Sequence, residues 1–146
     1  GASWVSLPDL LLGLVGFLLD MGGIPVHIVC SNGTEPFRKE MEALLASSPF
    51  GSEGKVYNNK DLWHLRSLLL TDPVDMLIGD SHGKHLAKDA DIPLARIGYY
   101  LPDRVHLHRQ AIVGYQGAIN LITMIANLFI DDYDRKCPEE RFEILR

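Results

Sequence analysis

The sequence predicts a doubly wound α/β domain, in which a parallel sheet of about five strands carries helices on both faces. Short apolar runs and amphipathic helical patterns alternate about five times along the chain, and tandem strand–helix units of this kind form parallel sheets. The 146 residues are 47% hydrophobic and 23% charged, as in an ordinary globular domain. A chain of this length can bury a core without a disulfide or a structural metal.

The first half of the chain predicts three strands and two helices. Pro8 and Asp9 suit the first turn of a helix. Amide groups in that turn have no partner within the helix, so the missing N–H of proline costs nothing, and the carboxylate of Asp9 lies at the positive end of the helix dipole. Thr34 is a suitable cap for the next helix. The elements expected in this half are a strand at 1–5, a helix at 8–21, a buried strand at 24–30, a helix at 35–46 and a strand at 55–57.

The second half continues the alternation. Asp61 is expected to cap a helix whose apolar positions are Leu62, Trp63, Leu65 and Leu69. The further expectations are a helix ending at 70, a strand at 74–78, a short helix at 82–88, a strand at 93–97, an irregular loop at 98–114, a helix at 115–130 and a charged tail from 131. We therefore expect one domain over residues 1–134 and a C-terminal tail over 135–146.

Charge and cysteine content restrict the class of partner and the compartment. The net charge is -5, and a mildly acidic chain with interspersed charges is a poor candidate for binding nucleic acid or an anionic membrane. The longest apolar stretch, 10–19, is too short to span a bilayer, and no targeting segment is visible. The two cysteines, Cys30 and Cys137, form no CxxC pair, which favours a reducing cytoplasm.

The turn Gly79–Lys84 is one candidate site, because it follows a predicted strand and precedes a helix. Backbone amides in such a turn can hold an anion. The alternative is structural: Gly79 and Gly83 shape a tight turn, and Asp80 or Ser81 caps the short helix. The chain has neither GxGxxG after the first strand nor GxxxxGK[ST] anywhere, so a nucleotide site built from this chain alone is not expected.

The densest polar cluster of the sequence lies in the loop 98–114. It consists of Arg104, His106, His108 and Arg109. The two histidines could bind a metal if the loop were extended, but no third ligand follows at a recognisable spacing. We therefore predict a subunit interface for the four residues and assign no catalytic, cofactor-binding or metal-binding residue. His64, on a predicted helix, is interpreted as a helix-face histidine rather than a catalytic base.

Several stretches of the chain carry a more specific signal. They are PVHIVCSNG at 25–33, ALLASSPFG at 43–51, KDLWHLRSL at 60–68, IGDSHGK at 78–84 and GYQGA at 114–118. In this order, and from Pro8 to about Asp134, the chain resembles the C-terminal part of nitrogenase component 1 β chains. The KDLWHLRSL stretch is the most specific element of the resemblance.

The resemblance implies a scaffold domain in a larger oxidoreductase. Such a β chain pairs with an α chain and a second β chain, and the assembly takes electrons from an ATP-hydrolysing iron protein to reduce dinitrogen to ammonia. The parent complex would hold an iron–sulfur relay cluster and an iron–molybdenum or iron–vanadium cofactor. The thiolate ligands of the relay cluster lie in the N-terminal region of the family's β chains, and the active-site cofactor belongs to the α chain. No cofactor is therefore expected in this stretch.

Some positions depart from the family pattern. Ser6–Asp9 stands where the family usually reads GDPD, and Gly98–Arg104 stands where it usually reads GFPIFDR. The tail 137–146 is more similar to vanadium-type or iron-only-type chains. Two alternatives share the same fold: a paralogue that holds the cofactor precursor during maturation, and a subunit of a nitrogenase-like tetrapyrrole reductase.

Overall fold

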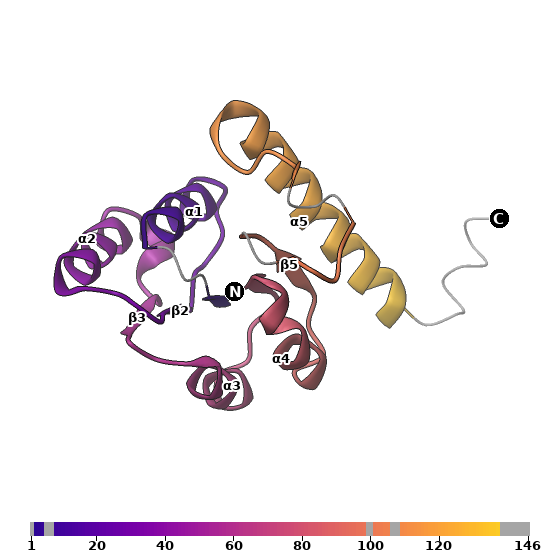
Figure 1. Cartoon of the computed structure of the whole chain (residues 1–146), viewed down its shortest axis with the longest axis horizontal. Coiled ribbons are helices and arrows are strands. Elements are labelled where there is room, and N and C mark those ends of the chain that lie inside the picture. Colours follow the sequence, from indigo (N-terminus) through magenta and orange to yellow (C-terminus); the bar gives the residue numbers. More distant parts are fainter. Residues whose placement is uncertain (1, 5–7, 99–100, 106–108, 138–146) are drawn as a thin grey trace. The chain divides into compact units, whose positions relative to one another are not determined.

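The computed structural model describes residues 2–4, 8–98, 101–105 and 109–137. The backbone contacts divide the chain into two compact units, Gly1–Gln110 and Ala111–Arg146. The first unit holds the whole sheet, and the second holds one long helix (Figure 1).

Strands and helices alternate along the first unit, as the sequence predicts. The elements are β1 (Ala2–Trp4), α1 (Pro8–Asp20), β2 (His27–Cys30), α2 (Glu35–Ala46), the 3₁₀ helix η1 (Pro49–Gly51), β3 (Lys55–Asn58), α3 (Leu62–Thr71), β4 (Leu77–Gly79), the 3₁₀ helix η2 (Ser81–Gly83), α4 (Lys84–Asp89) and β5 (Leu94–Arg96). Two predicted caps are present: the Thr34 hydroxyl accepts from the Phe37 amide, and the Asp61 carboxylate accepts from the His64 amide.

The five strands form one parallel sheet in the order β3-β2-β1-β4-β5. The central strand β1 pairs Ser3 with Ile28 of β2 on one side and with Ile78 of β4 on the other. The chain thus builds outward from β1 to β3, crosses back, and builds outward again to β5. Right-handed crossovers then place α1 and α2 on one face of the sheet and α3 and α4 on the other, as Figure 1 shows. The predicted doubly wound α/β fold is confirmed.

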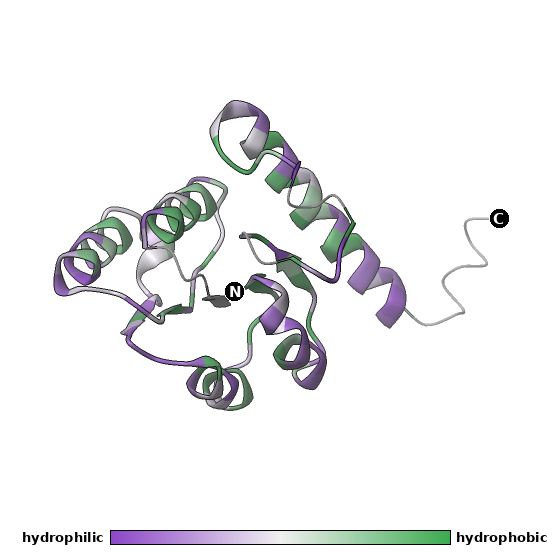
Figure 2. Cartoon of the chain, viewed as in Figure 1, coloured by the Kyte–Doolittle hydropathy of each residue, from purple (hydrophilic) through white to green (hydrophobic). Residues whose placement is uncertain are grey.

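Apolar side chains fill the space between the sheet and the helices. All four residues of β2 are buried, as expected for a strand covered on both faces. Figure 2 shows α1 as hydrophobic along most of its length, whereas α2 has a hydrophilic side. The core cluster beneath α3 and α4 consists of Val29, Leu65, Leu69, Leu77, Leu86, Ala87 and Leu94.

One polar side chain lies in this interior. His27 of β2 is 1% exposed, and its Nε2 donates to the carbonyl oxygen of Asp72 at 3.1 Å. Its Nδ1 has no hydrogen-bond partner among the described residues. The apolar run that predicted β2 gave no signal for this bond, because the partner follows α3, 45 positions later in the chain.

A close backbone approach joins η1 to the end of α2. A Cβ atom on Gly51 would lie 2.2 Å from the carbonyl oxygen of Leu45 and 2.7 Å from its carbonyl carbon. Only glycine fits at this distance, and the atoms it would meet belong to the backbone. The predicted loop 47–54 is therefore a tightly packed turn, capped where the Ser48 hydroxyl accepts from the Phe50 amide.

Three strands are shorter than the sequence predicts. The structure begins β2 at His27 instead of Ile24 and β4 at Leu77 instead of Val74, and β5 spans Leu94–Arg96 instead of 93–97. A proline lies at or just before the first residues of each predicted run, at positions 25, 73 and 93. Proline lacks the amide that a parallel ladder needs, so pairing by both backbone groups starts only beyond it.

The second unit holds α5 (Gly114–Lys136), which is longer than predicted. Residues 131–136, expected to open the charged tail, are helical. The Asp132 carboxylate pairs with Arg135 at 2.6 Å and with Lys136 at 2.9 Å, one turn of helix away in each case. These pairs and the basic residues facing the negative end of the helix dipole stabilise the last turn. Among the described residues, no helix combines the length and the apolar character needed to cross a membrane.

Candidate functional site

In doubly wound sheets, ligands bind beyond the carboxyl ends of the strands. Of the chain segments that leave this edge, the turns after β2, β3 and β4 are described throughout, and the loop after β5 is described up to residue 98, from 101 to 105 and from 109 onward. The turn after β4 and the loop after β5 are the two candidate sites from the sequence. The residues that follow β1 at 5–7 lie outside the described part of the chain.

The sequence left two roles open for the turn after β4, anion binding and a tight turn that caps the short helix. The structure shows the capped turn. Asp80 caps η2, since its carboxylate accepts from the His82 amide at 3.0 Å, and its other oxygen lies 3.1 Å from His82 Nδ1. A Cβ atom on Gly83 would lie 3.1 Å from Leu77 Cδ2 and 3.3 Å from Leu94 Cδ1. This glycine therefore lets the turn lie close against the side chains of β4 and β5. The helix that follows, α4, has only six residues.

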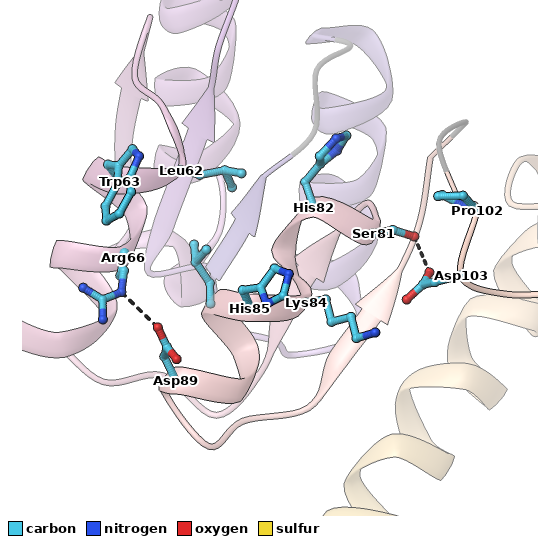
Figure 3. Close-up of a pocket in the computed structure, with 11 residues that line it drawn as sticks. Leu62, Trp63, Arg66, Ser81, His82, Lys84, His85, Asp89, Pro102 and Asp103 are labelled. Carbon is cyan, nitrogen blue, oxygen red and sulfur yellow. Dashed lines mark hydrogen bonds and ion pairs between the residues drawn. The ribbon is translucent and has the colours of Figure 1, made fainter.

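A polar network connects this turn to the loop after β5. The Ser81 hydroxyl donates to Asp103 Oδ1 at 2.5 Å (Figure 3). Arg96, the last residue of β5, donates from Nη2 to Asp103 Oδ2 at 3.0 Å and from Nε at 3.2 Å. Arg104 donates to the Asp103 carbonyl at 2.8 Å, while its guanidinium lies 3.6 Å from the Asp103 carboxylate. Asp103 therefore holds the two segments of the edge together.

Asp103 is an acid that stays ionised over a wide pH range. The hydroxyl of Ser81, and then the guanidinium of Arg96, hold the pKa of Asp103 at about 2, below the ordinary value of 3.8. Both partners stabilise the charged carboxylate by donating hydrogen bonds to it. An acid with this pKa is not a proton donor near neutral pH, so the arrangement indicates positioning rather than acid–base chemistry.

Beside this network lies an open groove of about 690 Å³. It runs between the beginning of α3, the turn and helix α4, and the loop after β5 (Figure 3). Its lining residues are Leu62, Trp63, Arg66, Ser81, His82, Lys84, His85, Leu86, Asp89, Pro102 and Asp103. Among these lining residues, Arg66 of α3 donates to Asp89 of α4 at 3.0 Å.

Helix α3 carries one correction and one unforeseen contact. Trp63 was grouped with the apolar positions of this helix, but its side chain is 74% exposed. It follows Leu62 by one residue, and neighbours in a helix cannot share a face. The His64 ring is half-buried and packs edge-on against Tyr57 at 5.1 Å between centroids. Its Nε2 is buried with no hydrogen-bond partner among the described residues.

The predicted interface residues are only partly described. Arg104 and Arg109 are exposed, whereas His106 and His108 lie outside the described residues. Their proposed interface role stays a prediction. The sequence missed Arg96, which the structure places nearer to the Asp103 carboxylate than the neighbouring Arg104. The sequence did carry a signal for Arg96: it is a charged residue at the end of an apolar run, and a charge buried there needs a partner of opposite charge.

The residues present do not fit an iron–sulfur cluster. Such a cluster is normally held by four thiolates, and the chain has two cysteines. Cys30 is buried with its thiol donating to Asn32 Oδ1 at 3.5 Å, and burial raises its pKa, which favours the protonated thiol. Within the described ranges, no three side chains of His, Cys, Asp or Glu gather as metal ligands.

Known proteins share both the sequence and the fold of this chain. The family model for nitrogenase component 1 type oxidoreductases matches residues 4–130. The nitrogenase molybdenum–iron protein β chain of Nostoc sp. strain PCC 7120 is 56% identical over 128 residues, which make up 88% of this chain and 25% of that relative. The corresponding chain of Azotobacter vinelandii is 46% identical over 136 residues, or 88% of this chain and 26% of that relative.

A solved structure titled "Nitrogenase Cp1 at pH 6.5" matches with a TM-score of 0.89 at 32% sequence identity, covering 95% of this chain and 30% of that chain. The chain thus spans between a quarter and a third of the length of these relatives. The family model covers most of the sequence, and the solved structure agrees with the doubly wound sheet described above. This chain therefore belongs to the nitrogenase component 1 type oxidoreductase family.

Proposed function

We propose that this chain is the C-terminal scaffold domain of a nitrogenase component 1 β chain. The parent complex would reduce dinitrogen to ammonia with electrons from an ATP-hydrolysing iron protein. The observation that supports this most strongly is the 56% identity to a relative named as a nitrogenase β chain, over 88% of the present sequence. The relatives from Nostoc and Azotobacter vinelandii both carry the β-chain name, which favours this function over a maturation scaffold or a tetrapyrrole reductase subunit.

The proposed role is structural and not catalytic. In the polar network at the carboxyl edge, both carboxylate oxygens of Asp103 already accept hydrogen bonds from Ser81 and Arg96. The two cysteines do not suit a cluster, as argued above, so the metal clusters of the parent complex would be held by residues elsewhere in that complex. The relatives' names contain molybdenum and iron, which favours a molybdenum-type parent over a vanadium type.

The proposed partners are the α chain, a second β chain and the iron protein. The loop 98–114, with Arg104, His106, His108 and Arg109, is the predicted contact region, together with residues 131–146. Exposed arginines such as Arg104 and Arg109 suit an interface, because arginine is enriched there. We retain a single domain over 1–134 with a tail over 135–146, and a cytoplasmic location, as proposals.

Complementation tests this function directly. The reading frame that contains the chain replaces the native β-chain gene in a nitrogen-fixing bacterium, and ¹⁵N-labelled ammonia is measured under ¹⁵N₂. Labelled ammonia is expected, with an empty vector as the negative control and the native gene as the positive control. A parent chain that accumulates and binds the α chain, yet yields no labelled ammonia, would contradict the proposal.

A further inference from the structure

The groove between α3 and α4 has an exposed aromatic side chain at one end. Trp63 is 74% exposed at the beginning of α3, and Pro102 and Asp103 close the other end. Figure 3 shows the lining side chains spread from Trp63 on α3 to Pro102 and Asp103 in the loop after β5. Tryptophan carries a large share of the binding energy at protein interfaces, and a groove lined from α3 to the loop after β5 can hold a polypeptide segment.

The charged side chains that line the groove indicate which charge a bound polypeptide segment would carry. Asp89 is already paired with Arg66 at 3.0 Å, and Asp103 is paired with Arg96 at 3.0 Å. Lys84 and His85 also line the groove, and neither side chain has a hydrogen bond or an ion pair with another described residue. Lys84 and His85 can both donate hydrogen bonds to a ligand. The carboxylates of Asp89 and Asp103, in contrast, are already paired with arginines.

We propose that this groove is the docking surface for an acidic segment of the same parent polypeptide, from outside residues 1–146. An apolar side chain of that segment would cover Trp63, and a carboxylate would lie at Lys84 and His85. This inference rests on the proposed function, because the relatives are about four times as long as the matched stretch. A tethered segment has a high effective concentration, so a shallow groove of mixed polarity suffices to hold it.

Site-specific cross-linking in the assembled complex tests the occupant. The photoreactive amino acid p-benzoylphenylalanine replaces Trp63 in the full-length parent chain, and cross-linked peptides are identified by mass spectrometry after illumination. Because Trp63 is exposed and lies outside the core, the replacement is expected to leave the fold intact. The expected product joins position 63 to an acidic peptide of the same chain outside residues 1–146. A product with the α chain or the iron protein, or the absence of any cross-linked peptide from the folded complex, would overturn the proposal.

A charge reversal with a matched control tests the proposed chemistry. Lys84→Glu is expected to lower the yield of this cross-link roughly threefold, because attraction becomes repulsion. Lys88→Glu changes the same residue type on the same helix, but Lys88 does not line the groove, so the yield is expected to be unchanged. Equal yields for the two variants would refute the acidic segment.

Cross-linking and nitrogen fixation fail independently. The cross-link requires only the folded parent chain, whereas ¹⁵N-labelled ammonia requires the complete enzyme system. A complex that cross-links as expected but forms no labelled ammonia would refute the proposed function and leave the docking surface intact. Labelled ammonia without the cross-link would refute the docking surface alone.

Discussion

The two flanks of the central strand β1 are held together by different means. On the first flank, residues 8–58, the tightest contact is a backbone approach, where Gly51 meets the carbonyl of Leu45. On the second flank, residues 61–105, a charged network around Asp103 joins the turn after β4 to the loop after β5. The first kind of contact depends on shape, and the second depends on ionisation. Substitutions and pH are therefore expected to affect the two flanks differently.

The largest effect is expected at the shape-dependent contact. Gly51→Ala would place a Cβ atom 2.2 Å from the Leu45 carbonyl oxygen, so the backbone must shift, at a cost of about 4 kcal/mol in the free energy of unfolding. Urea unfolding followed by circular dichroism measures this change. Gly13→Ala is the control, because no atom outside its chain neighbours and its own helix backbone lies within 4 Å of its Cβ position. There, alanine is expected to stabilise α1 by about 0.7 kcal/mol, and equal costs at the two sites would disprove the argument.

A smaller effect is expected from the apolar layer of the second flank. Leu65 is fully buried in the core beneath α3, so Leu65→Ala is expected to lower the free energy of unfolding by about 3 kcal/mol. Trp63→Ala, two positions away, removes a side chain that is 74% exposed and is expected to cost less than about 0.5 kcal/mol. The same urea titration compares the pair. A larger cost for Trp63→Ala would mean that α3 faces the sheet through a different side.

The smallest effect is the pH dependence of the charged network. The pKa of Asp103 is about 2 in the fold and 3.8 ordinarily, so its contribution to stability is present above pH 3.8 and disappears as the pH falls towards about 2. Asp103→Asn removes this titration, and the variant is expected to lose less stability than the wild type between about pH 5 and about pH 2. Urea midpoints at both pH values give the comparison.

Ser81→Ala sharpens the same test, because the Ser81 hydroxyl is the main cause of the low pKa. The variant is expected to raise the pKa of Asp103 towards 3.8, as followed by the carboxyl carbon shift in NMR. An unchanged titration would show that the guanidinium groups of Arg96 and Arg104 are sufficient to keep the pKa of Asp103 low.

The local signals in the sequence were sufficient for the architecture. Alternating elements predicted the doubly wound sheet, and Thr34 and Asp61 cap their helices as expected. These features depend on residues close together in the chain. Two other contacts join separate elements: Arg96 with Asp103, and His27 with Asp72. The residues around each partner in the sequence gave no sign of these contacts.

The sequence also did not predict the end of the last helix or the side of α3 on which Trp63 lies, for a related reason. Trp63 counted among the apolar positions of its helix, but its exposure depends on which face of α3 packs on the sheet. The predicted end of the last helix at residue 130 followed the end of the apolar pattern, while the helix continues through ion pairs of Asp132 with Arg135 and Lys136. Side-chain pairing one turn apart extends a helix without any apolar signal.

The burial of Cys30 makes this thiol a built-in reporter of local opening. Thiol reagents react with the exposed thiolate, and Cys30 is buried with a raised pKa, so its labelling must wait until β2 opens. Cys137, at the end of α5, is partly exposed and belongs to the second unit. The ratio of the two labelling rates therefore measures how often the sheet opens under native conditions, without any introduced probe.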